Sequence, residues 1–163
     1  MNKKEEILKM VVEARPLMQS STFKMYTYKD IGKKSKGLFK FDPNFNLDDF
    51  VAIYATAIFD SAKKGVVFNV DGIYFDYASE RKYLNYLDIK NFEIEQTLLS
   101  KTEHFRLRIN PDDTEKMRIG LICLNEEKGG EALQNLLLKI KDYCHQLNEN
   151  ESLQESGKET PYE

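Results

Sequence analysis

The chain contains few residues of the kinds on which metal, redox and catalytic sites usually depend. Its 163 residues include two histidines, two cysteines and no tryptophan. Cys123 and Cys144 form neither a CxxC motif nor a metal-ligand spacing, so we expect each to act as a small buried hydrophobe. GxSxG, HExxH, Walker and GxGxxG motifs are all missing. These absences predict a protein that has no cofactor, no metal site and no catalytic residues, and is therefore not an enzyme.

The two histidines and the paired carboxylates are the strongest remaining catalytic candidates. His104 begins a predicted strand and His145 lies late in a predicted helix, and neither has partners at metal-ligand spacing. Asp48-Asp49 and Asp112-Asp113 fall in predicted turns or helix starts, where local hydrogen bonding favours aspartate. A hydrolase or transferase would require a pocket in which one of the histidines meets carboxylates.

Long apolar runs and targeting signals are missing as well. No stretch approaches the roughly twenty consecutive apolar residues that a membrane-spanning helix requires. The N-terminal sequence MNKKEEILKMVVEARP is charged and carries Glu13 within its apolar run, which is not typical of a signal peptide. We therefore expect a cytoplasmic protein without a transmembrane segment.

Charge is unevenly distributed along the chain, although the net charge is only −3. Residues 1–45 contain ten Lys or Arg and five Asp or Glu, a balance of +5. Residues 46–163 contain fourteen and twenty-two, a balance of −8. Nucleic-acid-binding domains are usually clearly basic, so we expect no nucleic-acid partner.

The first third of the chain mixes helical and turn signals. Residues 3–18 have apolar side chains at helical spacing and predict an amphipathic helix, which Pro16 ends or kinks. A lysine-rich stretch follows and is expected to be partly helical around residues 28–39. Residues 41–46, FDPNFN, predict a turn. The apolar run from residue 47 is compatible with a short helix that leads into a strand, but periodicity alone does not decide this.

Asp71-Gly72, between two strand-like runs, gives the clearest local signal. This dipeptide is favoured in two-residue type I′ turns, in which both residues need a positive φ. Such a turn places Val67 and Tyr74 on one face of the hairpin. The other face then carries three directly opposed pairs of apolar or aromatic side chains: Val70 with Ile73, Phe68 with Phe75, and Val66 with Tyr77.

Further strand-like runs lead to a final helix. The runs are KYLNYLDI, NFEIEQTLL, HFRLRI and KMRIGLICL, and the polar turns between them are typical of an antiparallel meander. From Asn148 the sequence is polar and acidic, which predicts a disordered tail over residues 148–163. The helix before that tail carries a narrow apolar stripe made of Leu133, Leu136, Leu137, Ile140, Cys144 and Leu147.

Residues 49–89 combine several of these features in a characteristic order. An aliphatic segment with Tyr54 and Thr56 precedes a Ser-Ala-Lys-x-Gly turn, a hairpin and an aromatic-x-aspartate-Ile step over residues 86–89. This order resembles the bacterial pleckstrin-homology-like (PH-like) proteins of largely unknown function. The resemblance implies an α+β fold, in which an antiparallel PH-like sheet or partly open barrel is capped by the C-terminal amphipathic helix. The PH-like domain would span residues 46–147, after an N-terminal helical extension over residues 1–45.

The resemblance also implies a non-enzymatic binding or scaffold module. Another protein is the preferred partner, because a meander has edge strands to which a partner strand can pair. The amphipathic N-terminal helix is a further candidate surface, either for its own domain or for a second copy of the chain in a homo-oligomer. An anionic lipid surface is the alternative partner, contacted through Lys33, Lys34, Lys36, Lys63 and Lys64.

Overall fold

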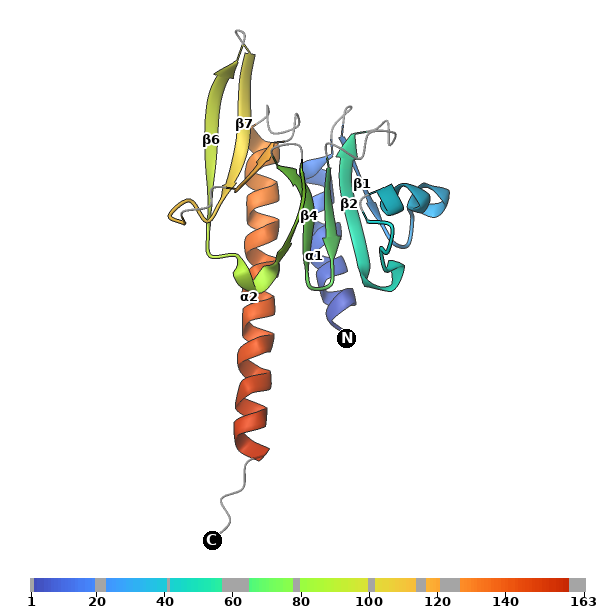
Figure 1. Ribbon diagram of the computed structural model, residues 1–163, viewed down its shortest axis with the longest axis vertical. Helices are drawn as coiled ribbons and strands as arrows, with labels where there is room; N and C mark the ends of the chain where they lie inside the picture. Colours follow the sequence, from blue (N-terminus) through green and yellow to red (C-terminus); the bar gives the residue numbers. More distant parts are fainter. Residues whose placement is uncertain are drawn as a thin grey trace.

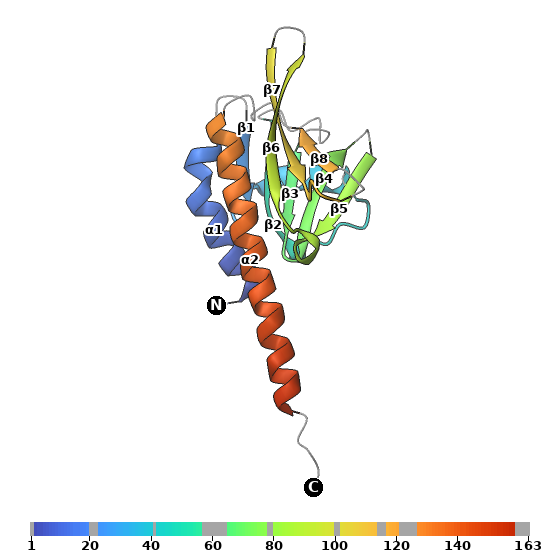
Figure 2. The same ribbon diagram turned by 90° about the vertical axis from the view of Figure 1, so that its left-hand side faces the viewer.

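The described residues form two antiparallel sheets and two long helices, so the fold is α+β (Figures 1 and 2). In both views the helices run side by side in opposite directions, and they cover one side of the sheets. The computed structural model describes residues 2–19, 23–40, 42–56, 65–77, 80–99, 102–113, 117–120 and 127–158.

Helix α1 (Lys3–Met18) confirms the helix predicted over residues 3–18. The side chain of Asn2 caps its first turn by accepting a hydrogen bond from the backbone N–H of Glu5. Pro16 does not end the helix, which continues for two more residues. Since Pro16 lies in the last turn, its missing N–H removes only one intrahelical hydrogen bond close to the natural end of the helix.

The larger sheet is a five-stranded antiparallel meander in which neighbours along the chain are neighbours in space. Its first strand was not expected from the lysine-rich sequence in which it lies. The strands are β1 (Phe23–Thr27), β2 (Phe50–Thr56), β3 (Gly65–Asn69), β4 (Gly72–Tyr77) and β5 (Glu80–Asn85).

The N-terminal extension expected over residues 1–45 packs against the rest of the protein and also contributes a strand to the larger sheet. Strand β1 pairs with β2 along its whole length, from Phe23 opposite Thr56 to Thr27 opposite Ala52. Helix α1 contributes Ile7 to the same core as the sheet. The physical reason is apolar burial, because this face of the sheet is otherwise left open to water.

Among the residues that the structure describes, three short 3-10 helices connect the strands: η1 (Gly32–Lys40), η2 (Leu47–Asp49) and η3 (Tyr86–Asp88). The helix expected around residues 28–39 is thus present as the 3-10 helix η1. Residues 42–46 form the predicted turn. The short helix leading into a strand is confirmed by η2 and β2.

The β3–β4 hairpin has the predicted faces but not the predicted register. Phe68 lies opposite Ile73, where we expected Phe75. Asp71 and Gly72 have no positive φ, which the described residues show only at Gly32 and Asn110. The predicted type I′ turn and its three pairs, Val70 with Ile73, Phe68 with Phe75 and Val66 with Tyr77, are therefore wrong.

Neighbouring elements explain the shifted register of this hairpin. The N–H of Val70 donates to the carbonyl of Asp49 at 2.9 Å, and the carbonyl of Asp71 accepts from the N–H of Tyr86 at 3.0 Å. The turn is thus bonded to η2 and η3. A shift of two residues preserves the alternation of faces, so Val66 and Phe68 still point into the main core.

The smaller sheet contains β6 (Phe92–Leu99), β7 (Thr102–Ile109) and β8 (Met117–Gly120), in that order and all antiparallel. These strands confirm the runs NFEIEQTLL and HFRLRI and the first part of KMRIGLICL, of which residues 121–124 lie outside the described residues. The described strands form two separate sheets and no closed barrel.

Helix α2 (Glu127–Lys158) packs against α1, η3 and the smaller sheet, and its C-terminal part projects beyond the rest of the protein (Figure 1). The predicted apolar stripe is buried from Leu133 to Cys144. The chain remains helical after Asn148, so the disordered tail that we expected is wrong at least as far as Lys158. Extending an existing helix costs little free energy, even where side chains such as Leu153 are exposed.

The five-stranded sheet has an apolar cluster on each face. The main cluster lies between the sheets and the helices. Within it the buried Tyr54 hydroxyl donates to the carbonyl of Met18 at 2.7 Å, and the Tyr86 hydroxyl donates to the carbonyl of Asn69 at 2.8 Å. The second cluster consists of Ile31, Leu38, Phe45, Phe50, Ile53, Ala55 and Val67.

Candidate functional site

The two edges of the five-stranded sheet differ in how they are covered. At β1 the backbone of Met25 is already bonded to α1 and its end: its N–H donates to the Gln19 side chain at 3.3 Å, and its carbonyl accepts from Arg15 at 2.9 Å. Farther along, the N–H of Thr27 donates to the carboxylate of Asp30 at 2.8 Å. Strand β1 is therefore closed to an additional strand.

Strand β5 forms the opposite edge of the sheet. Among the described strands it pairs only with β4. Leu84 is buried, whereas Glu80 and Tyr83 are exposed. An edge strand can accept an extended segment of another chain through backbone hydrogen bonds, and side chains near that segment give specificity. Strand β5 is therefore the candidate functional site.

A row of aromatic rings crosses the second face of the sheet and ends at β5. Ring centroids are 6.1 Å apart for Phe50 and Phe45, 5.8 Å for Phe45 and Tyr74, and 4.8 Å for Tyr74 and Tyr83. Tyr74 and Tyr83 are directly opposed across β4 and β5. Tyr83 keeps 47% of its surface exposed, so the row presents an aromatic side chain to solvent at the sheet edge.

Carboxylates surround the two tyrosines of this row. Burial, with smaller contributions from the nearby Asp71, Tyr74 and Asp49, raises the pKa of Tyr83 to about 12. Burial also raises the pKa of Tyr74, with contributions from Asp42 and Asp49. Both phenols are consequently neutral at neutral pH, in a field that is negative.

Gly72 allows Tyr83 to lie across the end of β4. A Cβ atom at position 72 would lie 2.3 Å from the carbonyl oxygen of Leu84 and 2.7 Å from the hydroxyl oxygen of Tyr83. Only a residue without a side chain fits there. The Asp71-Gly72 signal in the sequence thus marks a place of close approach instead of a type I′ turn.

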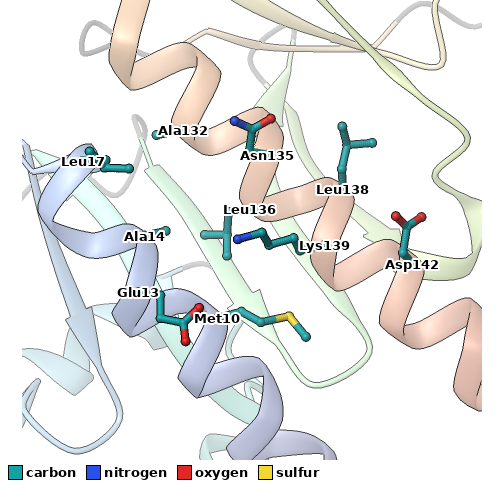
Figure 3. Close-up of a pocket in the computed structure, with 10 residues that line it drawn as sticks. All are labelled: Met10, Glu13, Ala14, Leu17, Ala132, Asn135, Leu136, Leu138, Lys139 and Asp142. Carbon is teal, nitrogen blue, oxygen red and sulfur yellow. The ribbon is translucent and has the colours of Figure 1, made fainter.

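A groove of about 340 Å³ separates the exposed surfaces of α1 and α2. Figure 3 shows Lys139 pointing from α2 toward α1, while Asp142 points away. Leu17, at the end of α1, is 70% exposed. The groove is lined by Met10, Glu13, Ala14, Leu17, Ala132, Asn135, Leu136, Leu138, Lys139 and Asp142.

A smaller cavity of about 200 Å³ lies near the start of α1 and includes Lys3, Asp71 and Cys144. Lys3 and Asp71 form an ion pair of 2.7 Å. Burial raises the pKa of the Cys144 thiol, an effect that Asp71 reinforces and Lys3 opposes. The thiol is therefore protonated at neutral pH and is a poor nucleophile.

The structure does not bring the catalytic candidates together. His145 lines neither of these two cavities, and the side chain of His104, in β7, lies outside the described residues. Asp48-Asp49 lies in η2, and Asp112-Asp113 lies in a turn, as predicted. In the part of the chain that the structure describes, no three His, Cys, Asp or Glu side chains gather as potential metal ligands.

The lysines proposed for lipid binding are only partly visible. Lys33 and Lys36 are exposed on η1, next to Phe39, which is 42% exposed. Lys34 lies in η1, but its side chain is outside the described residues, as are Lys63 and Lys64 altogether. None of the described helices is both long enough and apolar enough to cross a membrane.

Sequence analysis predicted that a meander would have edge strands, but it did not single out β5, Tyr74 or Tyr83. The missing information was which edge α1 would cover. A partial signal was present, because antiparallel pairing of β4 with β5 places Tyr74 and Tyr83 opposite each other. No protein-family model, curated protein or solved structure matches this chain.

Proposed function

We propose that this protein is a non-enzymatic, cytoplasmic protein-binding module that takes an extended segment of a partner protein as an additional strand beside β5. The observation that carries the proposal is the asymmetry of the sheet edges. Arg15 and Gln19 occupy the outward backbone groups of Met25 on β1, whereas β5 has β4 as its one described neighbour. Exposed sheet edges that persist in a folded protein are typical sites of strand addition.

The order of elements supports a PH-like identity for the module. Two antiparallel meanders are followed by a C-terminal helix whose apolar stripe is buried. Tyr54 and Tyr86, both part of the pattern that resembles the PH-like proteins, donate buried hydrogen bonds to backbone carbonyls. These residues therefore support a fold, and the binding site has to be sought on the surface.

Site-specific photo-cross-linking tests the proposal directly. p-Benzoylphenylalanine would replace Glu80 or Tyr83 on β5, with Glu131 on α2 and Lys36 on η1 as exposed control positions. We expect one protein to be cross-linked at both β5 positions and at neither control. Because paired strands advance in register, the two sites of attachment in the partner should lie about three residues apart.

The control positions make the result decisive. Attachment at Glu131 alone would place the partner on the helices, and attachment at Lys36 alone would place it on η1. Attachment at both β5 positions to partner residues far apart in sequence would exclude strand pairing. Each of these three results contradicts the proposal.

Anionic lipid is a second candidate partner, favoured by the combination of Lys33, Lys36 and the exposed Phe39 on η1. Basic residues add about 1 kcal/mol each to binding at an anionic surface. Sedimentation with vesicles of phosphatidylserine and phosphatidylcholine tests this. Lys36→Glu should reduce co-sedimentation, whereas Lys9→Glu, an equal change of charge on exposed α1, should not. Equal binding by both variants would argue against a site on η1.

A further inference from the structure

Strand addition would place a specific residue of the partner beside Tyr83. In an antiparallel pair, directly opposed residues have Cβ atoms about 4.5–5.5 Å apart and point to the same face. Tyr83 already has Tyr74 opposite it on β4. A partner strand would lie on the side of β5 away from β4. Its residue opposite Tyr83 would therefore contact the Tyr83 ring, which already packs against Tyr74.

The rings of this pair are suited to a cation. Their centroids are 4.8 Å apart, their planes are tilted by 51°, and Tyr83 is about half exposed. The face of an aromatic ring carries negative charge density and attracts an ammonium or guanidinium group within about 6 Å of the centroid. Two tilted rings offer such a group contact with both.

Asp49 and Asp71 lie near the end of β4 that the hydroxyl group of Tyr83 covers. The hydroxyl oxygen of Tyr83 lies over Gly72, next to Asp71 in the chain. The N–H of Val70 donates to the carbonyl of Asp49 at 2.9 Å, which holds η2 beside the same turn. A partner side chain that crosses the Tyr83 ring toward its hydroxyl group would therefore approach Asp49, whereas the carboxylate of Asp71 is already bonded to Lys3 of α1.

The cations already present pair with Asp71 and Glu80 but leave Asp49 without an ion pair among the described residues. Lys3 pairs with Asp71 at 2.7 Å, and Lys82 pairs with Glu80 at 3.0 Å on the strand itself. Arg81 lies on the same face of the sheet as Tyr83, directly opposite Asp76 of β4. Within the described residues Asp49 forms no ion pair, and its carboxylate accepts only from the Asn46 amide at 3.3 Å.

From this geometry we propose that the partner segment carries a lysine or arginine opposite Tyr83, with its cation held between the Tyr74–Tyr83 pair and the carboxylate of Asp49. This inference rests on the proposed strand addition at β5. A long side chain is required, because the cation has to cross the Tyr83 ring to approach Asp49. Charge complementarity thus identifies the partner as an extended segment with at least one basic residue in its centre.

A selection from random decapeptides displayed on phage, with the full-length protein as target, tests the inference without knowledge of the partner. We expect the recovered peptides to alternate β-branched or aromatic residues and to share one Lys or Arg. Replacing that residue by Met, which keeps an unbranched chain but removes the charge, should weaken binding roughly 3- to 30-fold in fluorescence anisotropy. Added salt should weaken the binding of the original peptide more than that of the Met peptide.

Variants of the protein identify the groups that contact the cation. Tyr83→Leu and Asp49→Asn should each weaken binding of the peptide that carries Lys or Arg, but should leave binding of the Met peptide nearly unchanged. Asp142→Asn, which removes an exposed carboxylate on α2, is the matched control and should have no effect. Thermal unfolding would establish that each variant is folded.

The outcomes separate this inference from the proposed function. Peptides that cross-link to β5 but share no basic residue, or that are insensitive to Tyr83→Leu, would overturn the inference and leave strand addition intact. Peptides that cross-link only to α1, α2 or η1 would overturn both. A selection that recovers no peptide, or peptides centred on Asp or Glu, also contradicts the inference.

Discussion

Gly72 illustrates how a single residue can be recognised correctly and explained wrongly. The Asp71-Gly72 pair suggested a turn with positive φ, but Gly72 has no positive φ in the structure. What excludes a side chain is space, because the carbonyl oxygen of Leu84 and the ring of Tyr83 occupy the place of a Cβ atom. Gly32 is the reverse case, with a φ of +56° and no atom within 4 Å of a Cβ.

These two glycines therefore predict opposite responses to the same substitution. Gly72→Asn should lower the free energy of unfolding by about 1–3 kcal/mol, the usual cost of overpacking. Gly32→Asn should be nearly neutral, because asparagine tolerates a positive φ better than other side chains do. Urea unfolding of the two variants measures both effects. Equal losses at the two positions would contradict the role assigned to Gly72.

Individual elements decide which edge of the sheet is available. Helix α1 ends beside β1, and Arg15 also pairs with Asp30 at 2.5 Å, so the first helix and the first strand are fixed together. The sequence signals for α1 were clear, but nothing in its pattern of apolar residues indicated that Arg15 and Gln19 would bond the backbone of Met25.

Removing this cover should open the β1 edge. The double variant Arg15→Ala/Gln19→Ala loses the side-chain bonds to Met25 and should be destabilised by about 1–3 kcal/mol. An uncovered edge also favours association between strands, so we expect a larger sedimentation coefficient at high protein concentration. Lys9→Ala, on the exposed side of α1, is the control. A monomeric, fully stable double variant would show that these bonds do not close the edge.

At this scale much of the fold could be predicted from the sequence. The two long helices, the turn over residues 42–46 and most strands followed from alternation, helical periodicity and turn residues. Strand β1 could not be predicted, because its five residues FKMYT lie in a polar, lysine-rich segment and acquire their structure by pairing with β2. The β3–β4 register was missed because η2 and η3, which are distant along the chain, bond its turn.

For the molecule as a whole, burial of Tyr86 makes the free energy of unfolding depend on pH in the alkaline range. Burial raises the pKa of Tyr86 well above its usual value of 10.0, with smaller contributions from Cys144, Tyr83 and Asp71. The folded protein therefore keeps this proton after the unfolded chain has released it. The stabilisation is complete below pH 10 and is lost as the pH rises above it, by up to about 1.4 kcal/mol per pH unit for this one group.

The variant Tyr86→Phe removes the titrating hydroxyl group and so isolates its contribution to the free energy of unfolding. At pH 7 the variant should be about 1 kcal/mol less stable than wild type, because it lacks the hydrogen bond to the carbonyl of Asn69. Above pH 10 its stability should fall less steeply, so the difference narrows or reverses. Urea unfolding at pH 7, 9, 10 and 11 measures this. Parallel curves for both proteins would contradict a buried, neutral Tyr86.

The projecting part of α2 makes a second prediction at this scale. Side chains from Asn148 to Glu155 are exposed, so they add little to the core. A chain ending at Asn148 should therefore unfold within about 0.5 kcal/mol of the full chain, as expected for surface changes. A larger loss of stability, dependent on protein concentration, would instead show that the projecting helix packs against a second copy.

The sequence by itself determined the α+β class, the amphipathic character of the two long helices and the faces of the central hairpin. These properties depend on the spacing of apolar residues, which local geometry translates directly into buried faces. Only the tertiary structure decided that β1 joins the sheet, that α1 closes its edge and that Tyr74 and Tyr83 meet beside Asp49 and Asp71. Those features depend on contacts between residues far apart in the chain, which no local pattern encodes.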